Sequence, residues 1–500
     1  MTDPVLETSA QAQERDRWTI DTEGIPSPVL MENAARALCR DLEKRMESGS
    51  QILILCGPGS NGQDGLAMLR VLREHGRLAS AFCQSKDTLQ NRILSARHID
   101  LITDPDKACR QMQTLQEKDW VVDAMFGSGL SRPLQGQWAK LAAAANDSKA
   151  RILAVDVPSG IHGETGVLGE VVIKADVTAA IGTRKLGTVL PASLPFAGRT
   201  VTLDIGLGTP DTARQVFELT RDKAAACLPA RPDLSWKGTF GRALMTGGSS
   251  RMHGAIEMAA SACFHSGIGL LSAAVPQVLE PALRCRLPEA MLVKVEGDPD
   301  RFSEESIEPL LETARTMTVV SAGNGMGREP GTAALVKALL QETTQTLVLD
   351  ADALSVLDTD WLNRQAGRTI LTPHPGEFCR MTSMDSAALR ANPVCAARDF
   401  SLQWPQTVLV LKGDITCVAE NGIVYVLDRP DSKLAKGGSG DLLCGIITGL
   451  AGSQEPFEAA LCGVWAHNRA AALCTKDPAA FTPQDLIDSL SGVWSELRKS

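Results

Sequence analysis

Short apolar runs alternate with segments of helical periodicity along the chain. In the first half, Gln51–Cys56, Trp120–Met125 and Ile152–Val157 are largely apolar runs, typical of strands buried on both faces. The preceding segment, Val29–Arg45, carries apolar residues at helical spacing and predicts a helix. This alternation predicts βαβ units around a parallel sheet, so we assign the α/β class.

A glycine-bearing loop follows each of the three predicted strands. The loops are Gly57–Gly65, Gly127–Leu130 and Pro158–Gly160. Ligands of open α/β sheets bind beyond the carboxyl ends of the strands. We therefore expect the three loops to line one crevice.

A second α/β series follows a break between about residues 207 and 237. Pro210, Pro229 and Pro232 punctuate this break, which is typical of a linker or a short connecting helix. The strands expected after it are Ala243–Thr246, Thr318–Ser321, Thr346–Leu349, Thr369–Leu371 and Val408–Leu411. Because one core rarely serves so long a chain, we predict two domains, residues 1–225 and 226–500.

Composition narrows the functional classes. The net charge of −9 argues against general nucleic-acid binding, because no basic excess is available to neutralise phosphates. The thirteen cysteines form no CxxC pair, and several, such as Cys444, lie in apolar runs, as expected for reduced thiols in a cytoplasmic protein. Residues 1–17 lack the apolar stretch of a signal peptide, and no segment is long enough to cross a membrane.

A glycine-rich segment near the C-terminus carries the clearest chemistry. Gly437–Asp441 runs directly into Leu442–Leu450, which is apolar and helix-like. Unpaired N–H groups at a helix start attract phosphate, and glycines let the backbone approach it. An aspartate at the rim of such an anion hole can take a proton from a hydroxyl as phosphate arrives on its oxygen. The alternative is a glycine-rich loop that Asp441 merely caps.

Oxygen-bearing side chains gather at the strand ends of the first half. They are Asn61, Asp64, Asp123, Asp156 and Ser159. Carboxylate, amide and hydroxyl oxygens suit a hard cation, and a remaining aspartate could act as acid or base. The alternative is that these aspartates cap helices or stabilise turns.

Four motifs of the first half resemble the NAD(P)H-hydrate epimerase domain. They are Leu30–Ala37, Gly59–Gly65, Val122–Leu130 and Asp156–Gly160, in the order found in that family. The family's loop usually reads GNNGGDG, and this chain has Ser60 and Gln63 instead. The resemblance implies a Rossmann-like parallel-sheet domain.

The resemblance also implies a set of site residues. Asn61, Asp123 and Ser159 would bind K⁺. The hydrated nicotinamide nucleotide would contact Ser60, Asn61, Gly62, Gln63, Asp64, Gly127, Ser128, Gly129, Leu130, Ser131, Arg132, Pro133 and Asp156. Asp156 is the candidate acid/base, because inversion of the hydroxyl-bearing carbon without redox chemistry needs proton transfers on both sides.

The second half resembles the ADP- or ATP-dependent NAD(P)H-hydrate dehydratase, of the ribokinase-like superfamily. The motifs are Gly247–Ser249, Gly323–Gly327, Thr372–Glu377, Lys412–Thr416 and Gly437–Asp441, and the match runs from about residue 241 onward. The family commonly has proline where this chain has Asn324. Asparagine tolerates unusual backbone angles, so we expect the turn to form.

Roles in the second site follow from the same resemblance. Lys412, Gly413, Asp414, Ile415 and Thr416 would hold the adenine nucleotide and Gly440 its phosphate, while Ala255, Gly325, His374 and Asp441 would contact the substrate. Asp441 would deprotonate the substrate hydroxyl, and Glu377 would lie near the phosphates and the Mg²⁺ that accompanies ADP. For His374 the alternative is a turn residue whose ring is hydrogen-bonded locally.

Together the two resemblances imply a bifunctional, homo-oligomeric repair enzyme for NADHX and NADPHX, the hydrates of NADH and NADPH. One domain would epimerise the R and S forms, and the other would dehydrate the S form with ADP, giving AMP and phosphate. The alternatives are a ribokinase-like small-molecule kinase fused to a nucleotide-binding domain, and a nucleotide-sensing regulatory protein. The preference between ADP and ATP, the preference between the two hydrates, and transfer of substrate between sites stay open.

Overall fold

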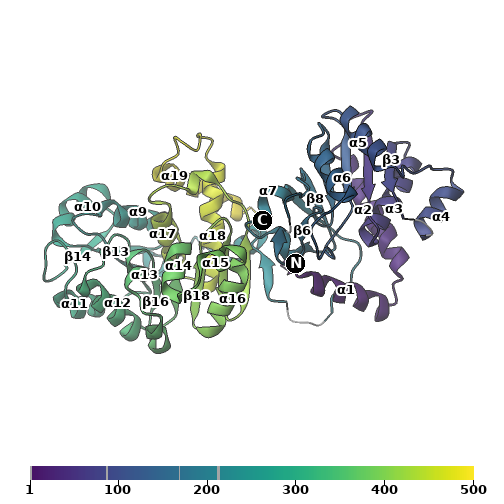
Figure 1. Ribbon diagram of the computed structural model, residues 1–500. Helices are drawn as coiled ribbons and strands as arrows, with labels where there is room; N and C mark the ends of the chain where they lie inside the picture. The colour runs from purple at the N-terminus through teal and green to yellow at the C-terminus, as the bar shows by residue number, and fades with distance from the viewer. Residues whose placement is uncertain (1–2, 86–87, 168, 211–213, 500) are drawn as a thin grey trace. The chain divides into compact units, whose positions relative to one another are not determined.

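The chain forms two compact units. The computed structural model describes residues 3–85, 88–167, 169–210 and 214–499 (Figure 1). The N-terminal unit comprises Pro4–Arg214, and the C-terminal unit comprises the chain from Gln215 onward together with Asp3. The chain therefore passes between the units twice.

The N-terminal unit contains a parallel sheet that, within the described residues, has six strands in the order β10-β8-β5-β4-β2-β3. Its strands, with four short pieces outside that sheet, are β1 (Leu6–Glu7), β2 (Gln51–Cys56), β3 (Leu78–Cys83), β4 (Trp120–Ala124), β5 (Arg151–Val155), β6 (Ile161–His162), β7 (Gly166–Val167), β8 (Val177–Ile181), β9 (Arg184–Lys185) and β10 (Arg199–Leu203). Its helices are α1 (Ser9–Asp21), α2 (Ser27–Glu43), α3 (Ser60–Glu74), α4 (Leu89–Ala96), α5 (Pro105–Thr114), α6 (Gln137–Asn146) and α7 (Leu194–Ala197).

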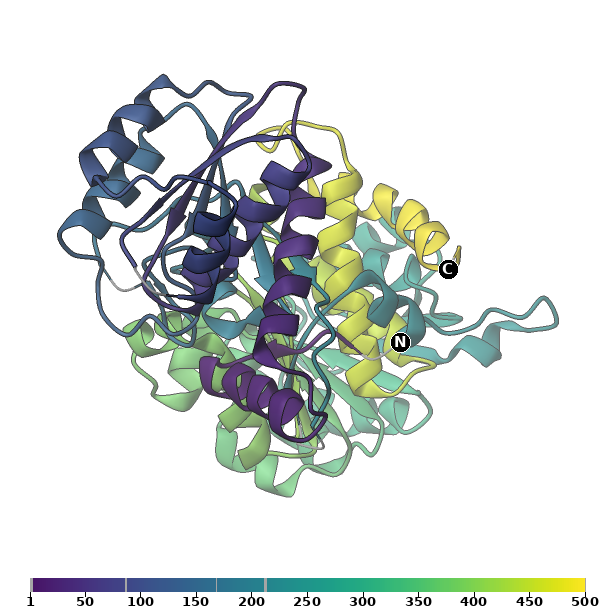
Figure 2. The ribbon, with the colours of Figure 1, turned by 90° about the vertical axis from the view of Figure 1, so that its right-hand side faces the viewer.

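Helices cover both faces of this sheet, as the N-terminal part of Figure 2 shows. Alternate residues of β2 point to opposite faces: Ile52 and Ile54 pack with α2 and α3, whereas Leu53 and Leu55 pack with α5 and α6. Burial on both faces explains why the strands are apolar runs without alternation.

The carboxyl ends of β2 and β4 mark the point where the strand order reverses. The backbone N–H of Gly57, directly after β2, donates to the carbonyl of Ala124 at the end of β4 (3.0 Å). A Cβ on Gly57 would stand 1.7 Å from the carbonyl oxygen of Met125, so only glycine fits there. Such a switch point is where open α/β sheets bind ligands.

The C-terminal unit contains a larger sheet that, within the described residues, has ten strands in the order β11-β20-β19-β18-β17-β16-β15-β12-β13-β14. Only β19 runs antiparallel to its two neighbours among these pairs. The strands are β11 (Val216–Glu218), β12 (Arg242–Thr246), β13 (Leu270–Ala274), β14 (Met291–Val293), β15 (Val319–Ala322), β16 (Thr346–Leu349), β17 (Thr369–Leu371), β18 (Thr407–Leu411), β19 (Thr416–Glu420) and β20 (Ile423–Leu427).

Its helices flank the sheet. They are α8 (Arg221–Cys227), α9 (His253–Phe264), α10 (Glu280–Arg286), α11 (Ile307–Ala314), α12 (Pro330–Glu342), α13 (Asp352–Val356), α14 (Pro375–Thr382), α15 (Ser386–Ala391), α16 (Pro393–Gln403), α17 (Ser439–Ala451), α18 (Pro456–Leu473) and α19 (Pro483–Leu497). The nearly all-buried α17 packs between α9 and α18. A second switch point lies between β12 and β15, because β12 pairs with both β13 and β15.

Two sequence expectations are corrected by the fold. Helix α17 begins at Ser439 rather than Leu442, because Gly438 ends the loop in a left-handed conformation (φ 92°). Asp441 therefore lies inside the first helical turn. The break, expected to be a linker or a short connecting helix, holds the short helix α8, which packs on α18. It also holds β11, which pairs with β20 and was not predicted, and the predicted boundary after residue 225 falls within α8.

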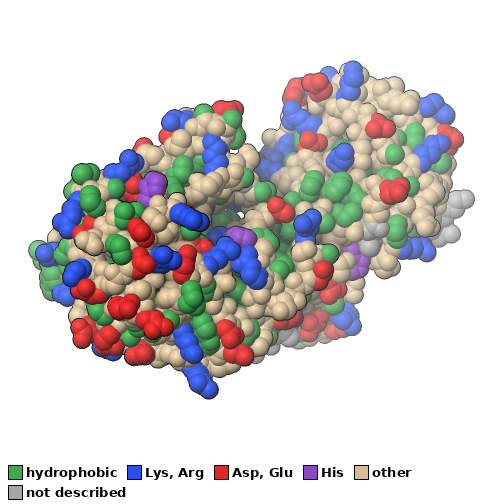
Figure 3. All heavy atoms as spheres, turned by 60° about the vertical axis from the view of Figure 1, so that its left-hand side comes forward, with side chains coloured by type: hydrophobic (Ala, Val, Ile, Leu, Met, Phe, Trp, Pro, Cys, Tyr) green, Lys and Arg blue, Asp and Glu red, His purple; other side chains and the backbone are tan. Residues whose placement is uncertain are grey.

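The surface and the cysteines are consistent with the composition. Acidic and basic side chains are mixed over the face shown in Figure 3. Cys56, Cys444 and Cys462 are buried free thiols. Among the described residues, no helix is both long and apolar enough to traverse a lipid bilayer.

Candidate functional sites

A cavity of about 380 Å³ opens at the switch point of the N-terminal unit. The predicted residues that line it are Ser60, Asn61, Asp64, Gly127, Ser128, Gly129, Leu130 and Asp156. The others predicted to contact the substrate, which are Gly62, Gln63, Ser131, Arg132 and Pro133, lie outside this lining. The loop after β2 is shorter than expected, because helix α3 already begins at Ser60. Gly62 and Gln63 therefore lie in the first turn of this helix and do not line the cavity.

Asp156 lies at the centre of this cavity with both carboxylate oxygens engaged. Its Oδ1 accepts from the ammonium of Lys185 (2.6 Å) and from the backbone N–H of Ile181 (3.3 Å). Within the described residues, its Oδ2 accepts one hydrogen bond, from the backbone N–H of Ser128 at 3.4 Å. Asp156 also has a left-handed backbone (φ 68°), which is uncommon outside glycine. The oxygen free to exchange a proton is therefore Oδ2.

Lys185 is a buried residue of this site that sequence reasoning missed. Its ammonium also donates to the carbonyls of Ile181 (2.8 Å) and Thr183 (2.9 Å), so all three of its N–H groups have partners. It lies on β9, just past the carboxyl end of β8. Neither β8 nor β9 was among the strands expected from the sequence, so no local pattern marked Lys185.

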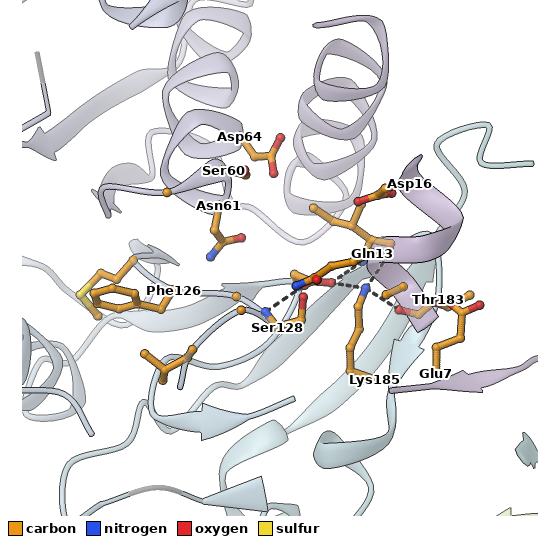
Figure 4. A pocket seen from close by; sticks show the side chains of 18 of the residues that line it. Glu7, Gln13, Asp16, Ser60, Asn61, Asp64, Phe126, Ser128, Thr183 and Lys185 are labelled. Atoms are coloured by element: carbon orange, nitrogen blue, oxygen red, sulfur yellow. Dashed lines mark hydrogen bonds and ion pairs between the residues drawn. The ribbon is translucent and has the colours of Figure 1, made fainter. Parts of the chain in front are cut away.

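Further carboxylates surround the Asp156–Lys185 pair. Figure 4 shows Asp64 on α3 and Asp16 on α1, both across the cavity from Lys185. Burial, and then the charges of Asp156 and Asp16, raise the pKa of Asp64 well above its usual value. Helix α1 is tied to this cavity by the Ser9 hydroxyl, which donates to the carbonyl of Ser128 (2.7 Å). The sequence of the polar N-terminal segment did not predict that α1 would contribute Asp16 to this cavity.

The three residues expected to bind K⁺ are only partly brought together. Asp123 is fully buried and accepts from Ser159 through the hydroxyl (2.7 Å) and the backbone N–H (2.7 Å). Asn61 instead lies near Gly127, where a Cβ would stand 3.3 Å from its Cγ. Its Nδ2 is buried without a hydrogen-bond partner. Burial raises the pKa of Asp123 to about 6.

In the C-terminal unit, Asp441 lies at the start of α17 beside the second switch point. Its Oδ1 accepts from the side-chain amide of Asn324 (2.8 Å). Burial is the largest cause that raises the pKa of Asp441 to about 6. The neighbouring Gly440 lies against Lys412, whose Nζ would be 3.2 Å from a Cβ at that position.

Lys412 joins this helix start to a second carboxylate. Its ammonium contacts Asp350 Oδ1 at 3.0 Å, and the same oxygen accepts from the hydroxyl of Thr372 (2.7 Å). Burial alone would lower the pKa of Lys412, but the charges of Asp350 and Glu377 outweigh it and raise that pKa. The positively charged ammonium of Lys412 therefore lies at the start of α17.

The other predicted residues of this unit are placed around that point. Gly325 adjoins Ala255, whose Cβ would be 3.2 Å from a Cβ on Gly325. The residues expected to hold adenine nucleotide, Lys412, Gly413, Asp414, Ile415 and Thr416, form the turn from β18 into β19. Sequence reasoning named neither the pairing role of Asp350 nor that of Asn324, although Asp350 directly follows a predicted strand.

His374 and Glu377 form a capping box at the start of α14. His374 Nδ1 accepts from the backbone N–H of Gly376 (3.0 Å), and Glu377 Oε2 accepts from the N–H of His374 (2.9 Å). The locally bonded ring matches the turn alternative. The ring Nε2 lies 3.4 Å from Glu377 Oε1, and the side chain of His374 is 54% exposed.

Known proteins resemble both units. The family described as NAD(P)H-hydrate dehydratase matches residues 243–491, and the family described as YjeF-related protein N-terminus matches residues 27–187. The bifunctional NAD(P)H-hydrate repair enzyme Nnr of Moorella thermoacetica is 34% identical, with 99% of this chain and 97% of that protein covered. The enzyme of the same name from Salinibacter ruber is 32% identical, with 99% and 96% covered.

Solved structures also resemble this chain. Among them is the ADP/ATP-dependent NAD(P)H-hydrate dehydratase from Bacillus subtilis, co-crystallised with ATP/Mg²⁺. It is 30% identical with a TM-score of 0.50, and the match covers 56% of this chain and 98% of that chain.

Proposed function

This chain belongs to the bifunctional NAD(P)H-hydrate repair enzymes, and from that premise we propose how its two sites divide the work. The N-terminal unit interconverts the R and S hydrates of NADH and NADPH, and the C-terminal unit dehydrates the S form with ADP. The observation that carries this proposal is a carboxylate beside each switch point, Asp156 in one unit and Asp441 in the other.

Asp156 is the acid/base of the epimerase site. Epimerisation opens and recloses the bond at the hydroxyl-bearing carbon, and a proton is needed on each side of that exchange. Lys185 fixes Oδ1 and balances its charge, while Oδ2 faces the loop of Gly127 and Ser128. The substrate would occupy the cavity between this loop and the start of α3.

A potassium ion fits the residues behind the loop. Asp123 is a fully buried carboxylate whose described partners are neutral hydrogen-bond donors, so its negative charge has no cationic side chain beside it. Asn61 could contribute to such a site only through its amide oxygen, because the unpartnered Nδ2 is a hydrogen-bond donor. Asn61, Asp123 and Ser159 would hold the ion, which would supply the missing positive charge and stiffen the loop.

Asp441 is the base of the dehydratase site. Hydroxide leaves the hydrated ring poorly, whereas phosphate leaves well. Asp441 takes the proton from the ring hydroxyl, and that oxygen attacks the terminal phosphoryl group of ADP as AMP departs. Loss of phosphate, together with loss of a proton from the neighbouring ring carbon, then restores the nicotinamide ring. Lys412 and the N–H groups at the start of α17 stabilise the transferred group.

Mg²⁺ enters this site with the nucleotide. The Bacillus subtilis dehydratase was co-crystallised with ATP/Mg²⁺, which supports that route. Glu377 is a poor candidate for a direct ligand, because its carboxylate already caps α14 through His374. We assign Glu377 instead to shaping the charge around Lys412.

The test uses the whole protein and a mixture of R and S hydrates. Absorbance of the reduced nicotinamide should recover completely when ADP is present, with one phosphate released per hydrate consumed. Without ADP, the two epimers should interconvert and no absorbance should return. A phosphorylated product that persists would instead indicate a small-molecule kinase and would contradict the proposal.

A further inference from the structure

Asn324 occupies the turn directly after β15, at the second switch point. The two glycines beside it take left-handed angles (Gly323 φ 127°, Gly325 φ 72°), whereas Asn324 itself does not. The turn thus forms as expected, but not because asparagine tolerates unusual angles.

That side chain is fully buried and bonded at both ends. Nδ2 donates to Asp441 Oδ1 (2.8 Å) and to Asp350 Oδ2 (3.2 Å). Oδ1 accepts from the thiol of Cys444 (3.4 Å). Burial keeps this thiol protonated by raising its pKa far above the ordinary value, so it can act as the donor. Only this orientation of the amide satisfies all three neighbours.

The charged groups around Asp441 come from several elements. Asp350 follows β16, Asp352 lies on α13, and both raise the pKa of Asp441. Lys412 follows β18 and opposes them, but it makes its contact with Asp350. The hydrogen bond that favours the ionised form of Asp441 comes from Asn324.

We propose that Asn324 is a positioning residue of the dehydratase site, which aims the Asp441 carboxylate and couples it to the Asp350–Lys412 pair. One N–H of the Asn324 amide donates to Asp441 and the other to Asp350, so a neutral donor lies between the two carboxylates. With proline at this position, no side-chain amide would lie between them. This inference rests on the proposed role of Asp441.

The kinetic test follows dehydration of the S hydrate at saturating ADP from pH 5 to pH 9. The variants are Asn324→Leu, which keeps the volume, and Asn324→Pro, which matches the common residue of the family. Both should move the acid limb of kcat by about one pH unit to higher pH, because a hydrogen bond to the ionised form is lost. At pH 9 kcat should return close to the wild-type level.

The control is Thr448→Val, which removes a buried hydroxyl bonded to the carbonyl of Cys444 on the same helix, away from Asp441. It should leave the acid limb in place. An equal loss of kcat at every pH in the Asn324 variants, with no shift of the limb, would overturn the positioning role.

A second measurement does not depend on activity. The melting temperature of Asn324→Leu should fall further below wild type at pH 8 than at pH 5, since ionised Asp441 then lacks its donor. We call this larger loss of melting temperature at pH 8 the widening. When Asp441→Asn is combined with Asn324→Leu, the widening should vanish. If it persists there, Asn324 does not act through Asp441.

The two measurements separate this inference from the proposed function. Should wild type fail to dehydrate the hydrate while the widening appears and depends on Asp441, the coupling stands and the assigned reaction is wrong. Should wild type dehydrate normally with an unmoved acid limb, the reaction stands and the role of Asn324 is wrong.

Discussion

Asp156 directly follows strand β5, whereas Asp441 lies in the first turn of helix α17, and the two carboxylates have different neighbours. Asp156 contacts the ammonium of Lys185 at 2.6 Å, whereas Asp441 contacts the neutral amide of Asn324 at 2.8 Å. A weakly supported carboxylate with a raised pKa suits a base that takes one proton during phosphoryl transfer.

At the residue scale, Asp441→Asn should abolish dehydration and leave epimerisation unchanged. Loss of a general base costs at least about a hundredfold in rate. In wild type the base must be ionised, so with a pKa of about 6 the dehydration rate should rise through pH 6 and then level off. Phosphate release from the S hydrate measures both effects. A variant that keeps a tenth or more of wild-type turnover would exclude Asp441 as the base.

The potassium assignment can be tested with two variants of the other site. Asp123→Asn should raise the potassium concentration needed for half-maximal epimerisation, because a charged ligand is lost. Asp156→Asn should stop epimerisation at every potassium concentration, while asparagine still tolerates the left-handed backbone. Potassium titration of the R/S interconversion rate distinguishes them. Rescue of Asp156→Asn by potassium, with Asp123→Asn unaffected, would mean that the two roles are exchanged.

Residue-level prediction succeeded where a side chain follows a strand and failed where a contact comes from far along the chain. Asn61, Asp64 and Asp156 line the cavity because parallel strands end together, whereas the third predicted loop, Pro158–Gly160, lies outside its lining. Lys185 reaches Asp156 through the short strand β9, which has no periodicity to reveal it. The amide contacts of Asn324 depend on two switch-point neighbours that no local pattern places together.

At the scale of elements, helix α17 shows how closely the site depends on packing. A Cβ on Gly445 would lie 2.0 Å from the carbonyl oxygen of Ala259 on α9, so the two helices approach through this glycine. The approach sets the position of the Asp441 turn. Apolar helices of this kind were predictable from sequence, but their closest contacts were not.

Gly445→Ala should therefore push α17 from α9, destabilise the protein by about 1–3 kcal/mol and reduce dehydration more than epimerisation. Gly492→Ala on α19 is the matched control, because its Cβ would make an ordinary contact with Leu473 at 3.5 Å. That control should be neutral or slightly stabilising, since alanine favours helices. Urea unfolding with both activity assays compares them; equal stability of the two variants would contradict the packing argument.

Strands were predictable in proportion to their burial. β2, β16 and β17 begin and end where their apolar runs do, since both faces of the strands are covered. The edge strands β11 and β14 are each three residues long and only partly buried, which leaves too short a pattern to detect. For this reason β11 was not predicted within the break between about residues 207 and 237.

At the scale of the whole molecule, the two-domain expectation leads to a fragment experiment with a revised boundary. Residues 4–214 should fold and epimerise alone, and residues 215–500 should fold and dehydrate alone. A fragment of residues 226–500 should be less stable, because it loses β11 and most of α8. Circular dichroism, thermal melts and both assays decide this. If the shorter fragment is as stable as the longer one, β11 and α8 are not integral to that unit.

Asp3 gives the molecule an order of assembly. Its carboxylate accepts from the hydroxyl of Tyr425, which lies 422 residues further along the chain, and it contacts Lys223 at 3.2 Å. During synthesis at roughly 5–20 residues per second, Asp3 would emerge tens of seconds before that tyrosine exists. The intervening residues 4–214 can complete their own unit in the meantime. During synthesis, Asp3 must therefore wait until the chain has reached Tyr425 before this pair can form.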